Sequence, residues 1–284
     1  MSLIREVQVS EIKEAVAKLC LQANTDLPDD VNCSLKEYLG KEESDYGKSI
    51  ILDLLENAKI AKEESLPMCQ DTGITLVFIE LGVDVHLDGD IYQAVNEGAK
   101  QGYTVNYLRK SIVSDPVFDR KNTGDNTPAV VHLSLVPGNK IKISVAPKGA
   151  GSENMSAVAM LTPSVGIEGV RKFVVETAIK AGANACPPMA VIGVGIGGTM
   201  ERAAFLAKKA LIRPMGECSA EPRYAKFEQE LLAEINEIGI KLSTSGKLTA
   251  ALDVHIEREP CHMASLPVAV SIQCNAARHK STVI

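Results

Sequence analysis

The hydrophobic pattern of this chain changes its period several times, and this limits the folds it can adopt more than any other feature. Segments with apolar residues at helical spacing alternate with short apolar runs that are rich in β-branched residues and bounded by glycine. Such an order is typical of an α/β protein. We therefore expect mixed sheets packed with helices, with a helical N-terminal layer over about residues 1–66.

The N-terminal layer carries two amphipathic patterns. Ser10 is a candidate N-cap for a helix whose apolar face includes Ile12, Val16 and Cys20. Cys20 is therefore expected in the core. A second helix is predicted over residues 46–62, with ionic residues away from its apolar stripe.

The rest of the chain predicts strands and helices in mixed order. An apolar run predicts a strand at 74–82, and two alternating segments within 129–147 predict a hairpin joined by Pro137-Gly138-Asn139. Further helices are expected at 91–101, 166–183, 199–211 and 221–238, and further strands at 188–196, 249–256 and 266–273. Since no repeat or low-complexity linker interrupts the chain, we expect one domain over 1–284, with only a soft boundary near residue 68.

Composition excludes several classes of function. The formal net charge is −6 with both signs interspersed, so no basic face for nucleic acid is expected. No apolar run approaches the roughly 18 residues that a membrane span needs, and the charged start does not look like a secretory signal, so we expect a cytoplasmic protein. The seven cysteines are widely spread, which favours reduced thiols, some of them metal ligands.

The segment Cys69-Gln70-Asp71-Thr72-Gly73 places a thiol beside a carboxamide and a carboxylate, between a predicted helix and a predicted strand. Loops placed by a rigid scaffold are where sites usually lie. A plain turn in which Asp71 caps backbone amides explains the same residues equally well.

Two other segments carry candidate ligands. Cys186 precedes two prolines, which cannot donate to a strand ladder, so it lies on a rigid connection; a buried, inert cysteine is the alternative. His262 and Cys274 flank a predicted strand and can meet only if the tertiary fold brings them together. A structural zinc site is poorly supported, because no C-x-x-C or H-x-x-H pair occurs in the chain.

The glycines from Gly193 to Gly198 look like a dinucleotide fingerprint after a strand. However, the acid-ended strand that should follow is replaced by a proline-rich loop, where Glu217 has the wrong setting. We interpret the glycines as allowing close packing of a helix on the strand, or as admitting a carboxylate to backbone amides. A non-catalytic nucleotide-binding subunit is the alternative from a different class.

Several motifs together resemble one known family, and they occur in its order over nearly the whole chain. They are CQDTG at 69–73, RKNTGDNTPA at 120–129, KGAGSENMS at 148–156, ACPP at 185–188 and CHMASLPVAVSIQC at 261–274. This set strongly resembles the iron-sulfur-dependent class I fumarases, a family that includes the two-subunit fumarases and the L-tartrate dehydratases.

The resemblance implies a [4Fe-4S] cluster with one iron that is not ligated by cysteine. The family's three cluster cysteines match Cys69, Cys186 and Cys274. The remaining cysteines have no counterpart role: Cys20, Cys33, Cys218 and Cys261.

The resemblance also implies roles around a small dicarboxylic acid. Asp71 matches the catalytic group that moves a proton. Arg109 matches a substrate-binding arginine, whose guanidinium suits a carboxylate, although a surface charge at a helix end is the alternative. The full set of implied substrate-binding residues is Gln70, Arg109, Lys148, Gly149, Gly151, Ser152 and His262.

Two departures from the single-chain members matter. Those enzymes continue into a second domain that supplies a catalytic lysine and threonine, whereas this sequence stops at Ile284. We therefore expect a separate β subunit, in an assembly of two α and two β chains. The KGAGSENMS loop also differs from the KGGGSANK form of the single-chain enzymes.

The implied activity is that of a hydro-lyase α subunit, with reversible hydration of fumarate to L-malate placed first. L(+)-tartrate dehydratase is the nearest alternative, and mesaconate hydratase is a further one. The choice depends on one or two polar contacts that this sequence does not reveal.

Overall fold

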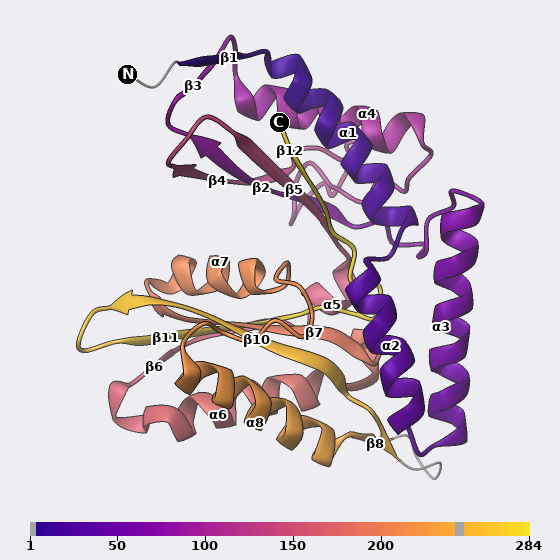
Figure 1. Cartoon of the computed structure of the whole chain (residues 1–284), viewed down its shortest axis with the longest axis vertical. Helices are drawn as coiled ribbons and strands as arrows, with labels where there is room; N and C mark the ends of the chain where they lie inside the picture. The colour runs from indigo at the N-terminus through magenta and orange to yellow at the C-terminus, as the bar shows by residue number, and fades with distance from the viewer. Residues whose placement is uncertain (1–3, 242–246) are drawn as a thin grey trace. The chain divides into compact units, whose positions relative to one another are not determined.

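The computed structural model describes residues 4–241 and 247–284, and the chain divides into two compact units (Figure 1). Unit 1 contains Met1–Pro28, Ala58–Ala150 and Arg278–Ile284, and unit 2 contains Asp29–Asn57 and Gly151–Ala277. Both units combine helices with a mixed sheet, so the predicted α/β class is confirmed. The expectation that residues 1–284 act as one domain stays a prediction.

Unit 1 is built on a four-stranded sheet with β2 (Ile74–Gly82) inside it. The strand order is β12 (Lys280–Val283), β5 (Ile141–Lys148), β2 and β4 (Val130–Val136). β2 runs antiparallel to β5 and parallel to β4.

The predicted hairpin over 129–147 is therefore wrong, although both of its strands form. β2 lies between β4 and β5 and pairs with each of them. The reason is burial: residues 75–79 of β2 are all buried, and a buried backbone needs hydrogen-bond partners on both edges. β4 is more exposed and stands at the edge of the sheet.

Two helices, α1 (Val9–Thr25) and α4 (Ile91–Val105), share one hydrophobic core with this sheet. Cys20 is fully buried in that core, as predicted. The prediction that Ser10 caps α1 is wrong: the N-cap is Gln8, whose backbone N–H donates to the Glu11 carboxylate (3.2 Å). The acidic side chain in the first turn takes up a free helix N–H and makes a serine cap unnecessary.

A small parallel pair lies beside these helices in unit 1. It consists of β1 (Arg5–Val7) and β3 (Val85–Leu87). Residues 91–101 were predicted to be helical, and this is confirmed by α4.

Unit 2 is built on a second four-stranded sheet. Its order is β10 (Ala251–Cys261), β7 (Met189–Gly198), β11 (Leu266–Ile272) and β6 (Ala157–Leu161). β7 runs parallel to β10 and antiparallel to β11. Figure 1 shows α7 (Met200–Ala210) on one face of this sheet, with α6 (Gly166–Ala181) and α8 (Pro222–Ile238) on the other.

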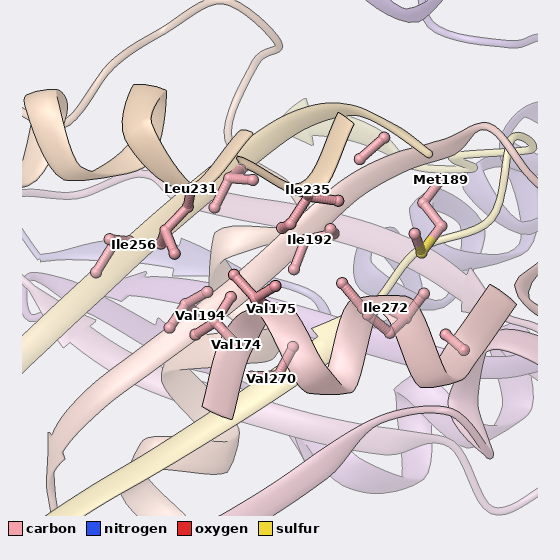
Figure 2. Packing of buried hydrophobic residues seen from close by; sticks show 14 of the residues in the cluster. Val174, Val175, Met189, Ile192, Val194, Leu231, Ile235, Ile256, Val270 and Ile272 are labelled. Carbon is pink, nitrogen blue, oxygen red and sulfur yellow. The ribbon is translucent and has the colours of Figure 1, made fainter. Parts of the chain in front are cut away.

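The two faces of β7 are used differently. Ile192 and Val194 point into the apolar core with Leu231 of α8, as Figure 2 shows. On the other face, a Cβ at Gly195 would lie 2.0 Å from the carbonyl oxygen of Ala203 in α7. The helix backbone can approach this closely because the residues of β7 that face α7 here are glycines without side chains. The close-packing interpretation of these glycines is therefore confirmed.

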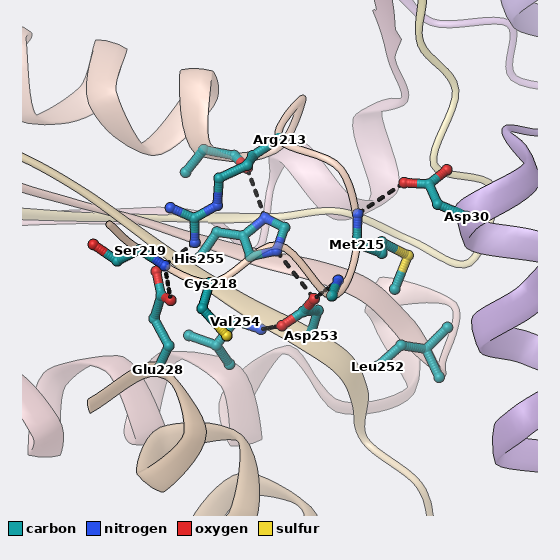
Figure 3. A network of polar contacts seen from close by, with 12 residues as sticks. Asp30, Arg213, Met215, Cys218, Ser219, Glu228, Leu252, Asp253, Val254 and His255 are labelled. Atoms are coloured by element: carbon teal, nitrogen blue, oxygen red, sulfur yellow. Dashed lines mark hydrogen bonds and ion pairs between the residues drawn. The ribbon is translucent and has the colours of Figure 1, made fainter. Parts of the chain in front are cut away.

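The proline-rich loop after α7 is held by carboxylates of unit 2 (Figure 3). Asp30 accepts the backbone N–H of Met215 (2.8 Å), and Asp253 accepts that of Gly216 (2.8 Å). Glu228 accepts the N–H of Ser219 (2.8 Å). The loop thus has a structural anchorage in place of the strand that a dinucleotide fold would require.

The remaining elements are short or peripheral, except for two long helices. The predicted helix at 46–62 is confirmed as α3 (Asp45–Glu63). α2 (Asp29–Lys41) was not predicted, because only Val31 and Leu35 are buried and they define no clear stripe.

None of the helices described is both long and apolar enough to cross a membrane. The rest are α5 (Ala150–Glu153), β8 (Ile240–Lys241), β9 (Lys247–Leu248) and 3₁₀ turns at Pro163–Val165 and Gly182–Ala185.

Candidate functional site

The loop Cys69–Gly73 of unit 1 leads directly into the central strand β2 and fixes the carboxylate of Asp71. One carboxylate oxygen, Oδ1, accepts the backbone N–H of Gly73 (2.9 Å), and the other, Oδ2, accepts that of Ala150 (2.8 Å). An ionised carboxylate has about four lone-pair sites, so each oxygen keeps acceptor capacity. Asp71 is half-buried, and its carboxylate is held in place by two backbone N–H groups.

Buried polar side chains hold the main chain of this loop. The Tyr103 hydroxyl donates to the carbonyl of Thr72 (2.6 Å), and the Asn126 amide donates to that of Gly73 (3.1 Å). Asn126 also accepts the N–H of Ser111 (2.7 Å). Burial raises the pKa of Tyr103, so its phenol stays protonated and remains a donor.

Gly73 brings the end of β5 against the loop. Its φ is +76°, and a Cβ there would lie 2.7 Å from the backbone nitrogen of Lys148. Lys148 is buried, and a Cβ on the next residue, Gly149, would lie 3.1 Å from Oδ2 of Asp71. Unit 1 therefore brings together Asp71, Lys148 and Gly149, which were predicted to share a site.

Arg109 also lies beside this loop. The Thr72 hydroxyl donates to the Arg109 carbonyl (2.9 Å). The Arg109 side chain is exposed and forms no ion pair within residues 4–241 and 247–284. Gln70 is exposed on the loop itself. The roles of Gln70 and Arg109 toward a substrate stay predictions.

The thiols of unit 1 differ in availability. Cys69 is half-buried, and its Sγ accepts the backbone N–H of Asp71 (3.4 Å). Burial raises the pKa of Cys20 to about 12, so that thiol stays protonated. Of these two, only Cys69 is suited to ligate a metal.

In unit 2 the segments of Cys186 and Cys274 meet at one end of the sheet. Asn275 donates to the Cys186 carbonyl through its backbone N–H (3.3 Å) and its side-chain amide (2.8 Å). Cys186 is exposed and Cys274 is half-buried. Cys186 precedes β7 and Cys274 follows β11, so the pairing of these strands brings the two cysteines together.

The predicted loop residues Gly151 and Ser152 adjoin both cysteine segments. A Cβ on Gly151 would lie 3.6 Å from the carbonyl oxygen of Asn184, two residues before Cys186. Ser152 is buried, and its carbonyl accepts the hydroxyl of Ser156 (3.4 Å). That hydroxyl oxygen accepts the N–H of Ile272 (3.2 Å), two residues before Cys274.

His262 lies elsewhere in unit 2. It is exposed in the turn between β10 and β11, where its Nδ1 accepts the N–H of Ala264 (3.1 Å). Its neighbour Cys261 pairs with Gly198 at the far end of β7, and a ten-residue strand spans about 30 Å. The structure therefore does not bring His262 together with Cys186 and Cys274.

The donor set for the predicted metal site is divided between the two units. Within the part of the chain that the structure describes, no three His, Cys, Asp or Glu side chains are grouped so as to hold a metal ion. Unit 2 brings Cys186 and Cys274 together, and unit 1 carries Cys69. All three cysteines lie on loops and none is fully buried, so in chemistry and access they fit thiolate ligands of iron.

Several residues that hold the site were not predicted as functional. Asn126 lies inside the RKNTGDNTPA stretch, and its φ of +62° is a conformation that asparagine tolerates better than most residues. Asn275 and Arg278 directly follow the third candidate ligand, in the run Asn275-Ala276-Ala277-Arg278. Polar residues among small ones at the end of a buried strand were the signal that could have found them.

The comparisons with known proteins give a consistent result. Residues 13–283 match the model of the family described as Fumarate hydratase (Fumerase). A protein of Methanocaldococcus jannaschii, named provisionally as an L(+)-tartrate dehydratase subunit alpha, is 42% identical over 273 residues, which cover 94% of this chain and 95% of that protein. The L(+)-tartrate dehydratase subunit alpha of Escherichia coli K12 is 33% identical over 284 residues, covering 99% and 93% of the two chains. That of E. coli UTI89 is 34% identical over 278 residues, covering 96% and 91%.

The matched region contains every candidate residue of the two units, from the Cys69 loop to Cys274. The family match covers nearly the whole chain, and it includes all of the ordered motifs and the loop that fixes Asp71. The chain belongs to the family of class I fumarate hydratases and L(+)-tartrate dehydratase alpha subunits, which are hydro-lyases.

Proposed function

We propose that this chain is the α subunit of an iron-sulfur hydro-lyase that removes water from L(+)-tartrate. The sequence alone placed fumarate hydration first and L(+)-tartrate second. The names of the similar proteins favour the second, since they are named as tartrate dehydratase alpha subunits. Fumarate is kept as the second candidate substrate because the matching family model carries that description.

One observation carries the proposal: a fixed carboxylate lies two residues from a free thiol on one loop. Asp71 accepts one backbone N–H on each oxygen, and its own N–H donates to Sγ of Cys69. Removing water from a hydroxy diacid breaks a C–H bond and a C–O bond on adjacent carbons. A positioned carboxylate next to a metal ligand suits the proton transfer in such a step.

The proposed cofactor is a [4Fe-4S] cluster held by Cys69, Cys186 and Cys274. When bound, it supplies an iron without a cysteine ligand, which acts as a Lewis acid toward a substrate carboxylate and hydroxyl. Asn275 supports this ligand set, because it joins the backbone segments of two of the three cysteines.

The remaining charge of a dicarboxylic acid requires fixed donors. Arg109 offers an exposed guanidinium beside the Asp71 loop, and a planar guanidinium can bind a carboxylate through two hydrogen bonds. The other proposed donors of this chain are Gln70, Lys148, Ser152 and the backbone at Gly149 and Gly151. His262 stays a prediction of the family resemblance, since its turn lies at the far end of the unit 2 sheet.

The proposal includes a partner chain. The similar proteins are named as alpha subunits, which implies that each has a partner. We propose that a β subunit completes the site of this chain, in an assembly of two α and two β chains in the cytoplasm.

Anaerobic co-purification of both chains tests the function. We expect a brown protein that contains iron and sulfide, that bleaches in air, and that dehydrates L-tartrate faster than L-malate. Initial rates with L-tartrate, L-malate, fumarate and mesaconate measure this preference. A colourless preparation that binds NAD and turns over none of the four acids would contradict the proposal, and a preference for fumarate and L-malate would select the second candidate.

A further inference from the structure

Arg278 of unit 1 is a buried cation that contacts the main chain of the candidate catalytic loop. Its side chain is 2% exposed. Nη1 donates to the carbonyl oxygen of Asp71 and to Oδ1 of Asn24 (3.2 Å). Asn24 in turn accepts the N–H of Met68 through its own carbonyl (2.9 Å). Arg278 and Asn24 together therefore hold the loop immediately before and at Asp71.

Stability alone does not explain why this position carries a charge. Burying a guanidinium costs free energy unless a carboxylate and further hydrogen bonds compensate. Arg213 of unit 2 shows the usual solution, with ion pairs to Glu228 and Glu257. No ion pair of Arg278 occurs among the residues that the structure describes, and this distinguishes it from Arg213, since the buried Nε atoms of both arginines have no hydrogen-bond partner.

The space at Gly149 shows which anion the guanidinium faces. A Cβ there would lie 3.1 Å from Oδ2 of Asp71 and 3.2 Å from Nη2 of Arg278. The carboxylate and the guanidinium therefore border the same small space, which glycine leaves free of a side chain. Their attraction acts in a partly buried setting, where charges interact more strongly than in water.

We propose that Arg278 is a positioning residue for Asp71. Its hydrogen bond fixes the main chain of Asp71, and its charge keeps the carboxylate turned toward the Gly149 space. Such placement matters because proton transfer needs the carboxylate at a defined distance from the reacting carbon. This inference rests on the proposed role of Asp71, and it adds a residue that acts through Asp71 without touching the substrate.

The kinetic test compares Arg278→Met and Arg278→Lys in the two-chain enzyme, purified without oxygen. We expect Arg278→Met to keep its iron and sulfide and to change the KM for L-tartrate by less than about threefold, while kcat falls about 100-fold. Arg278→Lys restores the charge with fewer donors and should recover kcat to about a tenth of the parental value. Arg213→Met is the matched control: it should lower the Tm but leave kcat per folded enzyme within about twofold.

A second measurement needs neither cluster nor activity. In the full chain freed of metal, we expect alkylation of Cys69 to be about ten times faster in Arg278→Met than in the parent, because the loop opens more often. Exposed Cys218 serves as the internal reference and should react at an unchanged rate.

The two measurements separate the possible failures. Unchanged Cys69 labelling together with an unchanged kcat in Arg278→Met would overturn the positioning role. Equal losses of cluster, fold and activity would overturn it as well, since they indicate a purely structural arginine. If Arg278→Met does not fold, Arg278→Lys with parental kcat and labelling overturns it. If Cys69 is labelled faster in Arg278→Met but the parent enzyme is inactive on every acid, the proposed function is refuted and the positioning role stands.

Discussion

Gly73 shows how strongly one residue is constrained beside Asp71. Its φ is +76°, and a Cβ would lie within 2.7–2.9 Å of three backbone atoms of Lys148. We expect Gly73→Ala to lose about 2–4 kcal/mol of unfolding free energy, from the left-handed backbone and from the clash. Urea denaturation measures this loss.

Gly124 offers a matched control for this prediction. Its φ is +80°, but nothing lies within 4 Å of the position that a Cβ would take. Gly124→Ala should therefore cost only the backbone term, about 1–2 kcal/mol. Equal losses in the two variants would show that contact with Lys148 contributes nothing.

The proposed ligands give a second prediction at this scale. Serine at position 69, 186 or 274 removes a thiolate that the cluster needs, so each of the variants Cys69→Ser, Cys186→Ser and Cys274→Ser should lose most of the bound iron and sulfide. Cys33→Ser and Cys218→Ser change exposed thiols without a proposed role and should retain both. Iron and sulfide analysis after anaerobic purification is the measurement, and a full cluster in any of the first three variants would reassign that ligand.

The sequence predicted the individual residues of the site unevenly. Cys69 and Asp71 were found because they stand together in one motif, and the burial of Cys20 followed from its place on a helix stripe. Arg278 was missed, since it reaches Asp71 across 207 positions of the chain and no local pattern records such a contact. Asn126 was quoted as part of a motif, but its support of Gly73 depends on tertiary structure.

At the scale of elements, the loop between α7 and α8 depends on ionised carboxylates. Burial disfavours the charge on Asp253, but hydrogen bonds from His255, Gly216 and Val254 outweigh it and hold the pKa of Asp253 below its usual value. Its contribution to stability is therefore present above the pKa of an unfolded aspartate, about 3.9, and is lost as the pH falls through the lower folded value.

Replacing Asp253 by asparagine tests this dependence. At neutral pH we expect Asp253→Asn to be less stable by about 2 kcal/mol, because the carboxylate binds His255 and Gly216 through Oδ2 and accepts the N–H of Val254 on Oδ1, whereas an amide has only one acceptor oxygen. The difference from the parent should shrink as the pH falls below about 4 and through the lowered pKa of Asp253, where the parent loses the same contribution. Urea unfolding across this range measures it. Glu176→Gln is the control, because Glu176 forms only an exposed pair with Lys172 on a helix surface. Its free energy of unfolding should stay within about 0.5 kcal/mol of the parental value at every pH.

Elements were predicted better than their pairing. The strands β2, β7 and β11 and the helices α3, α6 and α8 follow from hydrophobic period and glycine or proline boundaries. Strand neighbours do not follow from these signals. β4 and β5 look like a hairpin in sequence, but the most buried strand, β2, lies between them because its backbone needs two partners.

At the scale of the whole molecule, both units are discontinuous in sequence. Unit 1 takes three separate segments and unit 2 takes two. Composition does not change where one unit gives way to the other, so only the soft boundary near residue 68 was expected, and it coincides with none of the divisions. Each unit nevertheless carries a coherent part of the candidate site, with Asp71 and Arg109 in unit 1 and Cys186 and Cys274 in unit 2.

The last prediction concerns the partner chain. Removing water from a hydroxy diacid needs groups that act on two adjacent carbons, and Asp71 is the one proton-transferring group that we assign to this chain. If a β subunit supplies the others, the purified chain alone should show no dehydratase activity after anaerobic reconstitution, and added β chain should restore turnover in a saturable way. Asp71→Asn should bind the β chain with unchanged affinity and lose at least about 1,000-fold in kcat, since its carboxylate serves proton transfer and not assembly. Titration of each α variant with β chain, followed by activity and by sedimentation, separates the two effects. Dehydration of L-tartrate by this chain alone at the full rate would refute the two-chain site.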